Sequence, residues 1–506
     1  MLLHGDLLGE RARLTPEKTA LVYVPTGERF TYAELDARSV RWARLWREGL
    51  ELKKGDRVAV LCDNRPELIE TFFAAPKSGV VIVPIGTRLT PREMAGILED
   101  AAPAAFFYGD EHADKVRELR TLANVPLWVS LDEEQPAIER VSWTPEHGSP
   151  EDLWCLLYTS GTTGKPKGVM LPYRMIVWNG YNTVIGWQLR EDDVTSIFTP
   201  LYHAGGLGAF LVPIVTIGGT VILHRGFDAA EVWRTIEKEG ATVVLGVPTI
   251  YQMLSEAPEF QSADLSRVRW LISGGAPLPT WIIETYQRRG VAFKQGYGLT
   301  EVGVNCFSMT VEEAASHPGS IGKPLMFTET RLVDEDGHDV ALGEVGELLL
   351  RGPHVCRGYW NNIAATVVSL DADGWFHTGD LARRDEEGFH WIAGRRKDMI
   401  ISGGVNVYPA EIEGELVLHP DVRDAAVVGV AHPTWGEVGV AFIVSGEQRP
   451  TIEDLTAFLA GRLAKYKIPR EIRFVESLPR TPYGKVVKGE LRERYETEKD
   501  ADDRAH

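Results

Sequence analysis

Short apolar runs alternate with amphipathic stretches through much of the chain. Residues 57–61 form an apolar run, residues 66–77 follow with helical spacing, and residues 80–84 form a second apolar run. The same order recurs with an apolar run at 221–223, helical spacing at 229–239 and a second apolar run at 242–245. A strand, a helix and another strand in succession form the unit of a parallel sheet. The pattern therefore predicts an α/β fold whose large N-terminal domain contains parallel sheets.

Later segments have a different pattern. Polar and apolar residues alternate from 331 to 351 around a turn at 334–337, which predicts antiparallel strands in a small β-barrel-like subdomain. A basic cluster at 394–398 then separates two apolar stretches, and about a hundred residues with their own pattern follow, which is enough for a domain. We expect an N-terminal domain at 1–394, a hinge at 395–397 and a small mobile α+β C-terminal domain at 398–506.

The C-terminal domain has its own predicted elements. The pattern predicts a helix at 410–418, a strand at 425–429 and a helix at 452–463. Residues 493–506 are almost wholly polar, and we expect them to be disordered because they offer little apolar surface to bury.

One apolar stretch tests whether the chain enters a membrane. Residues 204–223 carry no charge and are about as long as a membrane span. Pro213 and five glycines interrupt the stretch, so the sequence predicts a short helix, a turn and a strand instead. The N-terminus lacks a cationic region followed by a sustained apolar core, as a secretory signal would have. We therefore expect a cytoplasmic protein without a membrane span.

Composition narrows the classes further. With 506 residues, 44% of them hydrophobic, the chain is longer than a single core usually grows. Its formal net charge of -18 repels polyanions, which argues against nucleic acid as the main partner. The four cysteines lie far apart in sequence, unlike zinc or redox pairs, so we expect buried thiols in a reducing compartment.

The strongest chemical signal lies at 158–169, which reads Tyr-Thr-Ser-Gly-Thr-Thr-Gly-Lys-Pro-Lys-Gly-Val. Glycines let backbone N–H groups approach an oxyanion, and hydroxyls and lysine add donors and positive charge. Pro166 follows Gly164 and Lys165 where the common P-loop has Ser or Thr, so a different type of phosphate loop is indicated. A flexible Gly/Thr hairpin turn is the structural alternative.

With this loop, further motifs make the chain resemble the adenylate-forming superfamily, which includes acyl-CoA synthetases, adenylation domains of peptide synthetases and firefly-type luciferases. The resemblance covers nearly the whole chain. It implies an acid–thiol ligase that forms an acyl adenylate from ATP and then an acyl-CoA thioester, releasing AMP and pyrophosphate. The motifs lie at 201–203 (Leu-Tyr-His), 273–277 (Ser-Gly-Gly-Ala-Pro), 296–301 (Gly-Tyr-Gly-Leu-Thr-Glu), 375–380 (Trp-Phe-His-Thr-Gly-Asp), 394–398 (Gly-Arg-Arg-Lys-Asp) and 479–485 (Pro-Arg-Thr-Pro-Tyr-Gly-Lys).

The resemblance implies a nucleotide site in the N-terminal domain. Tyr297 would stack on adenine, Asp380 would accept hydrogen bonds from both ribose hydroxyls, and Arg395 would lie beside the ribose. Thr300 would donate to the α-phosphate. The implied ATP- and AMP-binding residues are Thr159, Ser160, Gly161, Thr162, Thr163, Gly164, Lys165, Gly274, Gly275, Ala276, Gly296, Tyr297, Gly298, Thr300, Asp380 and Arg395.

The resemblance also assigns the chemistry. Lys485 would be the catalytic lysine that bridges the substrate carboxylate and the α-phosphate, where negative charge develops. Glu301, with Thr162, would hold Mg²⁺, a hard cation that prefers carboxylate and phosphate oxygens. Thr300 and His203 complete the implied catalytic set.

Members of this superfamily rotate the C-terminal domain between the two half-reactions. Lys397 matches the hinge position, where one backbone torsion absorbs the rotation. Gly403 and Gly404 lie in a segment that would face the active site during thioester formation and let pantetheine pass. Tyr466 and Arg470 occupy positions where some relatives bind the nucleotide of coenzyme A, with a plain polar helix end as the alternative.

Gly298 is the main indication of the acid. Relatives specialised for acetate or propionate carry tryptophan there, so glycine is expected to leave a deep pocket that buries a longer tail at about 0.8 kcal/mol per methylene. We expect a medium- or long-chain fatty acid. The alternative is an aryl or hydroxycinnamate acid, because flat rings suit glycine-lined slots and Asn305 or Thr249 would take a ring hydroxyl. The expected acyl pocket consists of His203, Val247, Thr249, Gly298, Gly303 and Asn305.

Other classes fit the motifs less well. An amino-acid adenylation module would carry an aspartate near His203, where this chain has uncharged Ala204-Gly205-Gly206. A non-catalytic relative would lose the catalytic groups, which are all present here. A luciferase is only weakly disfavoured, because luciferases share the adenylating chemistry. The expected partners are a small carboxylic acid, ATP and coenzyme A, and a homodimer is left open.

Overall fold

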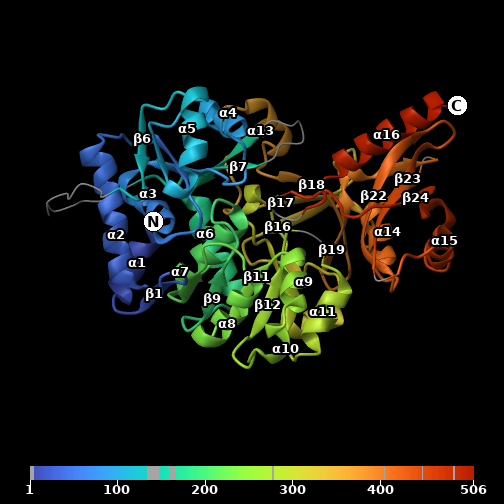
Figure 1. Ribbon diagram of the computed structural model, residues 1–506, viewed down its shortest axis with the longest axis horizontal. Helices are drawn as coiled ribbons and strands as arrows, with labels where there is room; N and C mark the ends of the chain where they lie inside the picture. The colour runs from blue at the N-terminus through green and yellow to red at the C-terminus, as the bar shows by residue number, and fades with distance from the viewer. Residues whose placement is uncertain are drawn as a thin grey trace.

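The computed structural model describes residues 5–133, 148–159, 166–275, 278–403, 405–446, 448–481 and 485–505. Two large α/β sheets and a four-stranded antiparallel sheet are followed by a five-stranded sheet near the C-terminus. Figure 1 shows this last sheet and its helices, orange to red, to one side of the rest of the chain. The predicted α/β class is therefore confirmed.

The first large sheet has six strands in the order β6-β5-β3-β4-β7-β8. Neighbours pair in parallel except β7 and β8, which are antiparallel. Strand β3 has the predicted bounds 57–61. Helix α3 extends one residue beyond the predicted helix at 66–77. The elements of this region are α2 (Tyr32–Arg44), β3 (Arg57–Leu61), α3 (Pro66–Ser78), β4 (Val81–Pro84), α4 (Pro91–Ala101), β5 (Ala105–Tyr108), α5 (Ala113–Leu122), β6 (Leu127–Ser130), β7 (Leu153–Thr159) and β8 (Lys167–Pro172).

The second large sheet has seven strands in the order β13-β12-β11-β9-β10-β1-β2, all parallel except β1 and β2. The order predicted between residues 221 and 245 is confirmed by β10, α8 and β11. The elements are α1 (Leu7–Leu14), β1 (Thr19–Tyr23), β2 (Arg29–Thr31), α6 (Tyr173–Gly186), β9 (Val194–Ile197), β10 (Thr220–Leu223), α8 (Ala229–Glu239), β11 (Val243–Gly246), α9 (Pro248–Glu256), α10 (Glu259–Ser262), β12 (Trp270–Ser273), α11 (Thr280–Gln287) and β13 (Phe293–Gln295).

The uncharged stretch at 204–223 is broken as expected. It forms a π-helix, η3 (Gly205–Leu211), then α7 (Val212–Ile217), then a turn in which Gly218 has φ 84°, and then strand β10. Within the described ranges, no helix combines the length and the apolar character that crossing a bilayer requires.

The predicted antiparallel region forms a sheet in the order β16-β17-β18-β19. Its strands are β16 (Glu329–Val333), β17 (Gly346–Arg351), β18 (Phe376–Arg384) and β19 (His390–Arg395), and the smaller elements around it are β14 (Phe307–Ser308), α12 (Val311–Ser316), β15 (Lys323–Pro324) and α13 (Ile363–Ser369).

The C-terminal part contains β20 (Ile400–Ser402), β21 (Val405–Val407), α14 (Pro409–Leu416), β22 (Val422–His432), β23 (Gly436–Ser445), α15 (Ile452–Ala460), β24 (Glu471–Phe474) and α16 (Lys488–Ala505). The three predicted elements correspond to α14, β22 and α15. The expected disorder of residues 493–506 is wrong, because α16 extends to Ala505. Leu491 and Tyr495, four residues apart on this helix, are both buried against the sheet, which supplies the apolar anchor that the polar composition concealed.

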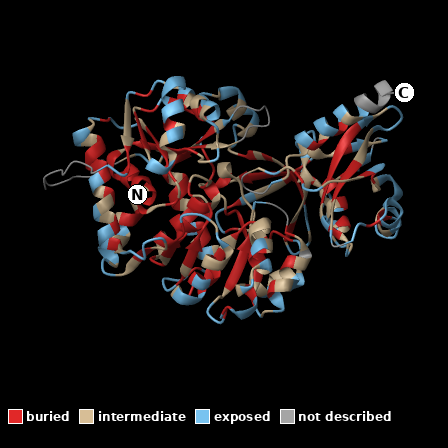
Figure 2. Cartoon of the chain, viewed as in Figure 1, coloured by how far each residue is buried: buried red, intermediate tan, exposed pale blue. Residues whose placement is uncertain are grey.

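Buried residues lie along the strands of the sheets, and the outer faces of the helices are exposed (Figure 2). One cluster includes Val58 of β3, Val221 of β10 and Leu350 of β17, so the first three sheets share a continuous core. The C-terminal sheet has separate clusters on its two faces, with successive residues Val427 and Val428 pointing into different ones.

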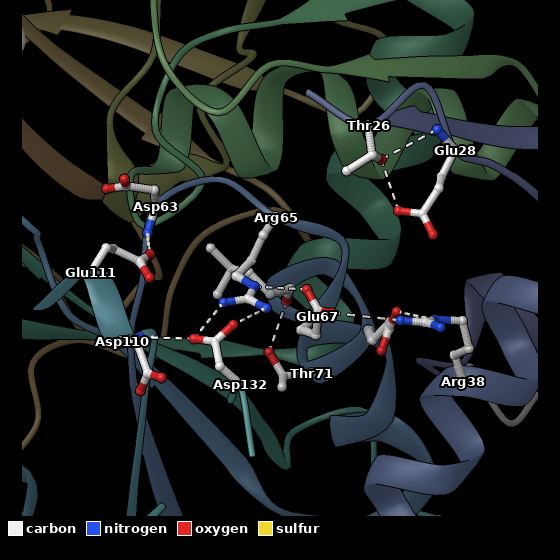
Figure 3. A network of polar contacts seen from close by, with 12 residues as sticks. Thr26, Glu28, Arg38, Asp63, Arg65, Glu67, Thr71, Asp110, Glu111 and Asp132 are labelled. Atoms are coloured by element: carbon white, nitrogen blue, oxygen red, sulfur yellow. Dashed lines mark hydrogen bonds and ion pairs between the residues drawn. The ribbon is translucent and has the colours of Figure 1, made fainter. Parts of the chain in front are cut away.

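Charged side chains tie together the ends of the first sheet's strands (Figure 3). Arg65, after β3, pairs with Asp132, after β6, at 2.9 Å, and its Nε donates to Glu67 at 2.8 Å. The backbone N–H of Asp110, after β5, donates to Asp132 Oδ2 at 2.8 Å. These contacts fix the loops at the carboxyl ends of the parallel strands, the edge where such sheets bind ligands.

Candidate active site

The proposed phosphate loop joins β7 to β8. Thr159 at the end of β7 pairs with Lys167 at the start of β8, so the element that follows the proposed loop is a strand and not the helix that follows a common P-loop. The predicted residues Ser160, Gly161, Thr162, Thr163, Gly164 and Lys165 lie outside the described residues, as do Ala276 and Gly404.

Asp380, Tyr297 and Arg395 lie together. Asp380 in β18 faces Arg395 in β19 across the sheet, and Arg395 Nε lies 2.8 Å from Asp380 Oδ1. The hydroxyl of Tyr297, beyond β13, donates to Asp380 Oδ2 at 2.6 Å. Burial and the nearby Asp380 charge raise the pKa of Tyr297, so the phenol stays the donor. Each carboxylate oxygen of the buried Asp380 keeps a further lone pair for another donor.

Glycines line the neighbouring strand ends. Gly274 and Gly275 follow β12, and Gly296 follows the adjacent β13, with its N–H donating to Ser273 O at 2.7 Å. Gly275 has φ 83°, a conformation that favours glycine. A Cβ placed on Gly274 would lie 3.7 Å from Gly296 O, so the two predicted segments lie side by side.

The turn after these glycines carries Thr300 and Glu301 in a short 3₁₀ helix, η4 (Thr300–Val302). Tyr359 O–H donates to Glu301 Oε1 at 3.0 Å. Burial raises the pKa of Glu301, whereas the charges of Arg395 and Lys485 lower it. Tyr359 could not be predicted as a partner of Glu301, because 58 residues separate the two along the chain.

Lys485 reaches this group of residues from the C-terminal sheet region. Its N–H donates to Thr481 Oγ1 at 3.2 Å and its carbonyl accepts from Thr481 N at 2.8 Å, so two hydrogen bonds hold the lysine backbone to Thr481. The charges of Asp380 and Glu301 act on its ammonium. Lys485 as a whole residue is exposed, yet desolvation of its ammonium is the main cause that lowers its pKa, followed by the charge of Arg395.

His203 also lies in the field of Lys485. Burial, Arg88 and Lys485 together lower the pKa of His203 to about 3, so its imidazole is neutral at neutral pH. Its loop is anchored by Asn64, which is 3% exposed: Asn64 Nδ2 donates to Thr199 O at 3.0 Å, and Leu201 N donates to Asn64 Oδ1 at 2.9 Å.

The lowered pKa of Lys485 predicts a pH effect on adenylation. The ammonium is present below its pKa and is lost as the pH rises through it, so we expect pyrophosphate release to fall at a pH below the ordinary lysine value of 10.5. Conversion of a supplied acyl adenylate to thioester is not expected to fall over this range. Parallel pH profiles of the two half-reactions provide the test, and an equal alkaline loss in both would contradict it.

The residues expected to line the acyl pocket differ in their burial and in the room around them. Val247 is buried before α9, and Thr249 is half-buried at its start. A Cβ on Gly298 would lie 1.9 Å from Val304 O, a backbone atom, so no side chain fits there without movement of the backbone. The idea that tryptophan at Gly298 would simply close the pocket is therefore corrected.

Gly303 and Asn305 are the neighbours of Val304 in the chain. Asn305 is 2% exposed, and its Nδ2 donates to Thr183 Oγ1 at 2.7 Å and to Ala209 O at 3.2 Å. That amide nitrogen is thus already engaged within the core. Gly303 has φ 84° and packs against Asn179 and His354.

The hinge and coenzyme A candidates lie beyond β19. Lys397 is in a 3₁₀ helix, η5 (Arg396–Asp398), which directly follows Arg395. Gly403, with φ 60°, donates its N–H to Trp435 O at 2.8 Å. Tyr466 is half exposed in η6 (Lys465–Lys467), and Arg470 N donates to Gly439 O at 2.7 Å. The described hydrogen bonds and ion pairs do not join these residues to Asp380 or Glu301.

Comparisons place the chain among known proteins. A family model described as AMP-binding enzyme matches residues 8–360, and one described as AMP-binding enzyme C-terminal domain matches residues 411–485. The chain is 41% identical to a feruloyl-CoA synthase of Amycolatopsis sp., over 96% of this chain and 97% of that protein. It is 35% identical to a long-chain-fatty-acid–CoA ligase of Mycobacterium tuberculosis, over 97% of this chain and 98% of that protein. ATP-bound MatB from Rhodopseudomonas palustris matches with a TM-score of 0.88 at 32% identity, covering 97% of this chain and 99% of that chain.

The chain therefore belongs to the family of AMP-binding enzymes, within the adenylate-forming superfamily that its motifs resemble. It is an AMP-forming acyl-CoA synthetase, an acid–thiol ligase that uses ATP and coenzyme A.

Proposed function

We propose that this enzyme activates an aryl acid of the hydroxycinnamate type. The observation that carries the proposal is the 41% identity to a feruloyl-CoA synthase, against 35% to a fatty-acid ligase at nearly equal coverage. The sequence placed a fatty acid first and an aryl acid second, and this proposal places the aryl acid first. The argument for a fatty acid depended on Gly298 as a missing lid, and in this chain the Val304 backbone leaves no room for a side chain there unless the backbone moves, whatever the substrate.

In the proposed nucleotide site, Asp380 accepts from the ribose hydroxyls and Tyr297 stacks on adenine. Tyr297 and Arg395 hold the Asp380 carboxylate in place, which supports a fixed acceptor there. Thr300 donates to the α-phosphate, and the glycines at 274, 275 and 296 give the nucleotide close access to the backbone.

Glu301 suits a hard divalent cation. It offers carboxylate oxygens at the turn beside Thr300, and burial disfavours its charge unless a cation is nearby. Bound Mg²⁺ would offset the repulsion between the triphosphate and the substrate carboxylate. Thr162, the other proposed metal residue, lies outside the described residues.

Lys485 is proposed to bridge the substrate carboxylate and the α-phosphate. The neutral imidazole of His203 adds no second cation to compete for the same carboxylate. That carboxylate is already ionised at neutral pH, so the adenylation step needs no general base.

The second half-reaction needs a different arrangement of the two proposed domains, 1–394 and 398–506. Rotation about the hinge at 395–397 would withdraw Lys485 and present Gly403 and Gly404 to the adenylate. Tyr466 and Arg470 are proposed to contact the nucleotide of coenzyme A.

An acid panel tests the substrate. We expect kcat/KM for ferulate or 4-coumarate to exceed that for octanoate by at least about tenfold, because a pocket that fits a planar ring would make fewer favourable contacts with a flexible chain. Pyrophosphate release and CoA-ester formation are measured together for ferulate, 4-coumarate, octanoate and acetate, with an acid-free control. A preference for octanoate would return the substrate to the fatty-acid class, and no pyrophosphate with any acid would overturn the adenylating function.

A further inference from the structure

The segment at 353–360 lies against the strand that leaves the phosphate loop. Met170 N donates to Gly358 O at 2.9 Å, Arg357 N donates to Met170 O at 3.1 Å, and Trp360 N donates to Gly168 O at 2.7 Å. The segment thereby adds an edge to β8, which starts one residue after Pro166. Movement of the loop's exit strand would break these bonds.

The same segment holds the turn that carries Glu301. Cys356 N donates to Glu301 O at 2.8 Å, so the backbone of the turn is fixed. Tyr359 O–H donates to the carboxylate of Glu301 at 3.0 Å, so the side chain is fixed as well. Both bonds come from residues only three positions apart.

Tyr359 contacts both parts at once. The ring is 8% exposed, and the Lys167 ammonium lies 5.3 Å from its centroid, within the range of a cation–π contact. Its hydroxyl meets Glu301 at the other end of the ring. One rigid side chain therefore spans from the end of the phosphate loop to the proposed metal-binding carboxylate.

His354 supports the turn from behind. The ring is fully buried; its Nδ1 lies 2.8 Å from Val302 O, and its Nε2 lies 2.7 Å from Thr328 Oγ1. A carbonyl oxygen only accepts, so Nδ1 carries the proton and Nε2 accepts from the threonine hydroxyl. Burial lowers the pKa of His354 to about 4, which is consistent with this neutral tautomer at neutral pH.

We propose that the segment at 353–360 is a brace that sets Glu301 at a fixed position relative to β8, the strand that leaves the phosphate loop, with Tyr359 and His354 as its positioning residues. The proposal deepens the adenylating function and rests on it. Adenylation needs the metal-bound triphosphate held between these two parts. Thioester formation from a finished adenylate needs neither the triphosphate nor the metal, so the brace is expected to affect only the first half-reaction.

Tyr359→Phe is the first test, because it keeps the ring over Lys167 and removes only the hydroxyl that meets Glu301. We expect the apparent KM for MgATP and the half-saturating Mg²⁺ concentration to rise about tenfold, as for a lost hydrogen bond to a charged group. Conversion of a supplied acyl adenylate to thioester is expected to stay within about twofold. Isothermal titration of ATP, with and without Mg²⁺, is expected to lose most of the affinity gain that Mg²⁺ gives the wild type.

A matched control exists on helix α16, which packs against the C-terminal sheet. Tyr495 is 3% exposed and donates its hydroxyl to Glu471 at 2.7 Å, so Tyr495→Phe makes the same chemical change outside the proposed site. It is expected to leave the Mg²⁺ dependence unchanged. A general loss of stability would alter both variants and both half-reactions, whereas the brace predicts an effect of Tyr359→Phe alone.

Variants of His354 separate positioning from packing. His354→Leu removes the donor to Val302 and is expected to shift the Mg²⁺ dependence in the same direction as Tyr359→Phe. His354→Asn keeps a donor near the Nδ1 position and is expected to restore most of the effect. Equal losses in both half-reactions, or an unchanged Mg²⁺ dependence in Tyr359→Phe, would overturn the brace. Failure of the wild type to release pyrophosphate with any acid would instead overturn the proposed function, and the ATP titrations would still test the brace.

Discussion

Replacing Lys485 with alanine is expected to lower pyrophosphate release by a factor on the order of 10²–10³, the usual cost of losing a preorganised group that stabilises transition-state charge. Attack of the substrate carboxylate on the α-phosphate brings two anions together. The charges of Glu301 and Asp380 act on the Lys485 ammonium, and Thr481 accepts a hydrogen bond from the Lys485 backbone. Loss of the ammonium leaves the developing charge without its counter-ion.

The half-reactions distinguish this role from a general defect. The Lys485→Ala enzyme is expected to convert a supplied acyl adenylate to the CoA thioester at a rate within a few-fold of wild type, because the proposed mechanism does not use the lysine in that step. Lys488→Ala is a matched control, since Lys488 lies three residues further on and pairs with Glu413 at 2.7 Å. Equal loss of both half-reactions in Lys485→Ala would count against the proposed division of labour.

Local elements could be predicted where their start and stop signals are also local. Helix α8 matches its predicted bounds because Asp228 caps its first turn, accepting from Glu231 N, and Gly240 ends it with φ 67°. Strand β3 is equally clear, because five mostly apolar residues lie between polar ones. The motifs that resemble the superfamily then located Asp380, Tyr297 and Arg395, which the fold brings within hydrogen-bonding distance.

Features that depend on contacts distant in sequence could not be predicted. The wrong expectation of disorder at the C-terminus shows this, because only the folded sheet reveals that Leu491 and Tyr495 anchor α16. Likewise, the close approach of Val304 O to Gly298 is a property of the backbone path and leaves no mark in the residue pattern. His354 and Tyr359 contact the Glu301 turn across more than fifty residues, so no motif around Glu301 pointed to them.

Lys397→Pro is expected to affect the half-reactions in the opposite way to Lys485→Ala. Adenylation is largely retained, and thioester formation falls by a factor on the order of 10². Lys397 is the middle residue of η5, between Arg395, which pairs with Asp380, and β20. Proline fixes φ at about -65°, which agrees with a 3₁₀ helix. It prevents the change in φ at residue 397 that rotation would need. The arrangement that directs Lys485 to the site is thus retained, and the second arrangement is blocked.

Proline at position 397 is also expected to lower the rate of adenylation. This loss reduces the measured difference between the two half-reactions. Proline disfavours a helical conformation at the preceding Arg396, whose guanidinium pairs with Glu347 at 2.7 Å, so adenylation is expected to fall by a few-fold. Lys397→Ala removes the side chain without fixing φ, and both half-reactions are expected to stay near wild type in it. Pyrophosphate release and thioester formation from a supplied adenylate are measured for both variants. If alanine reproduced the effect of proline, the lysine side chain would be responsible and the hinge assignment would be wrong, because only a backbone pivot makes φ the property that matters.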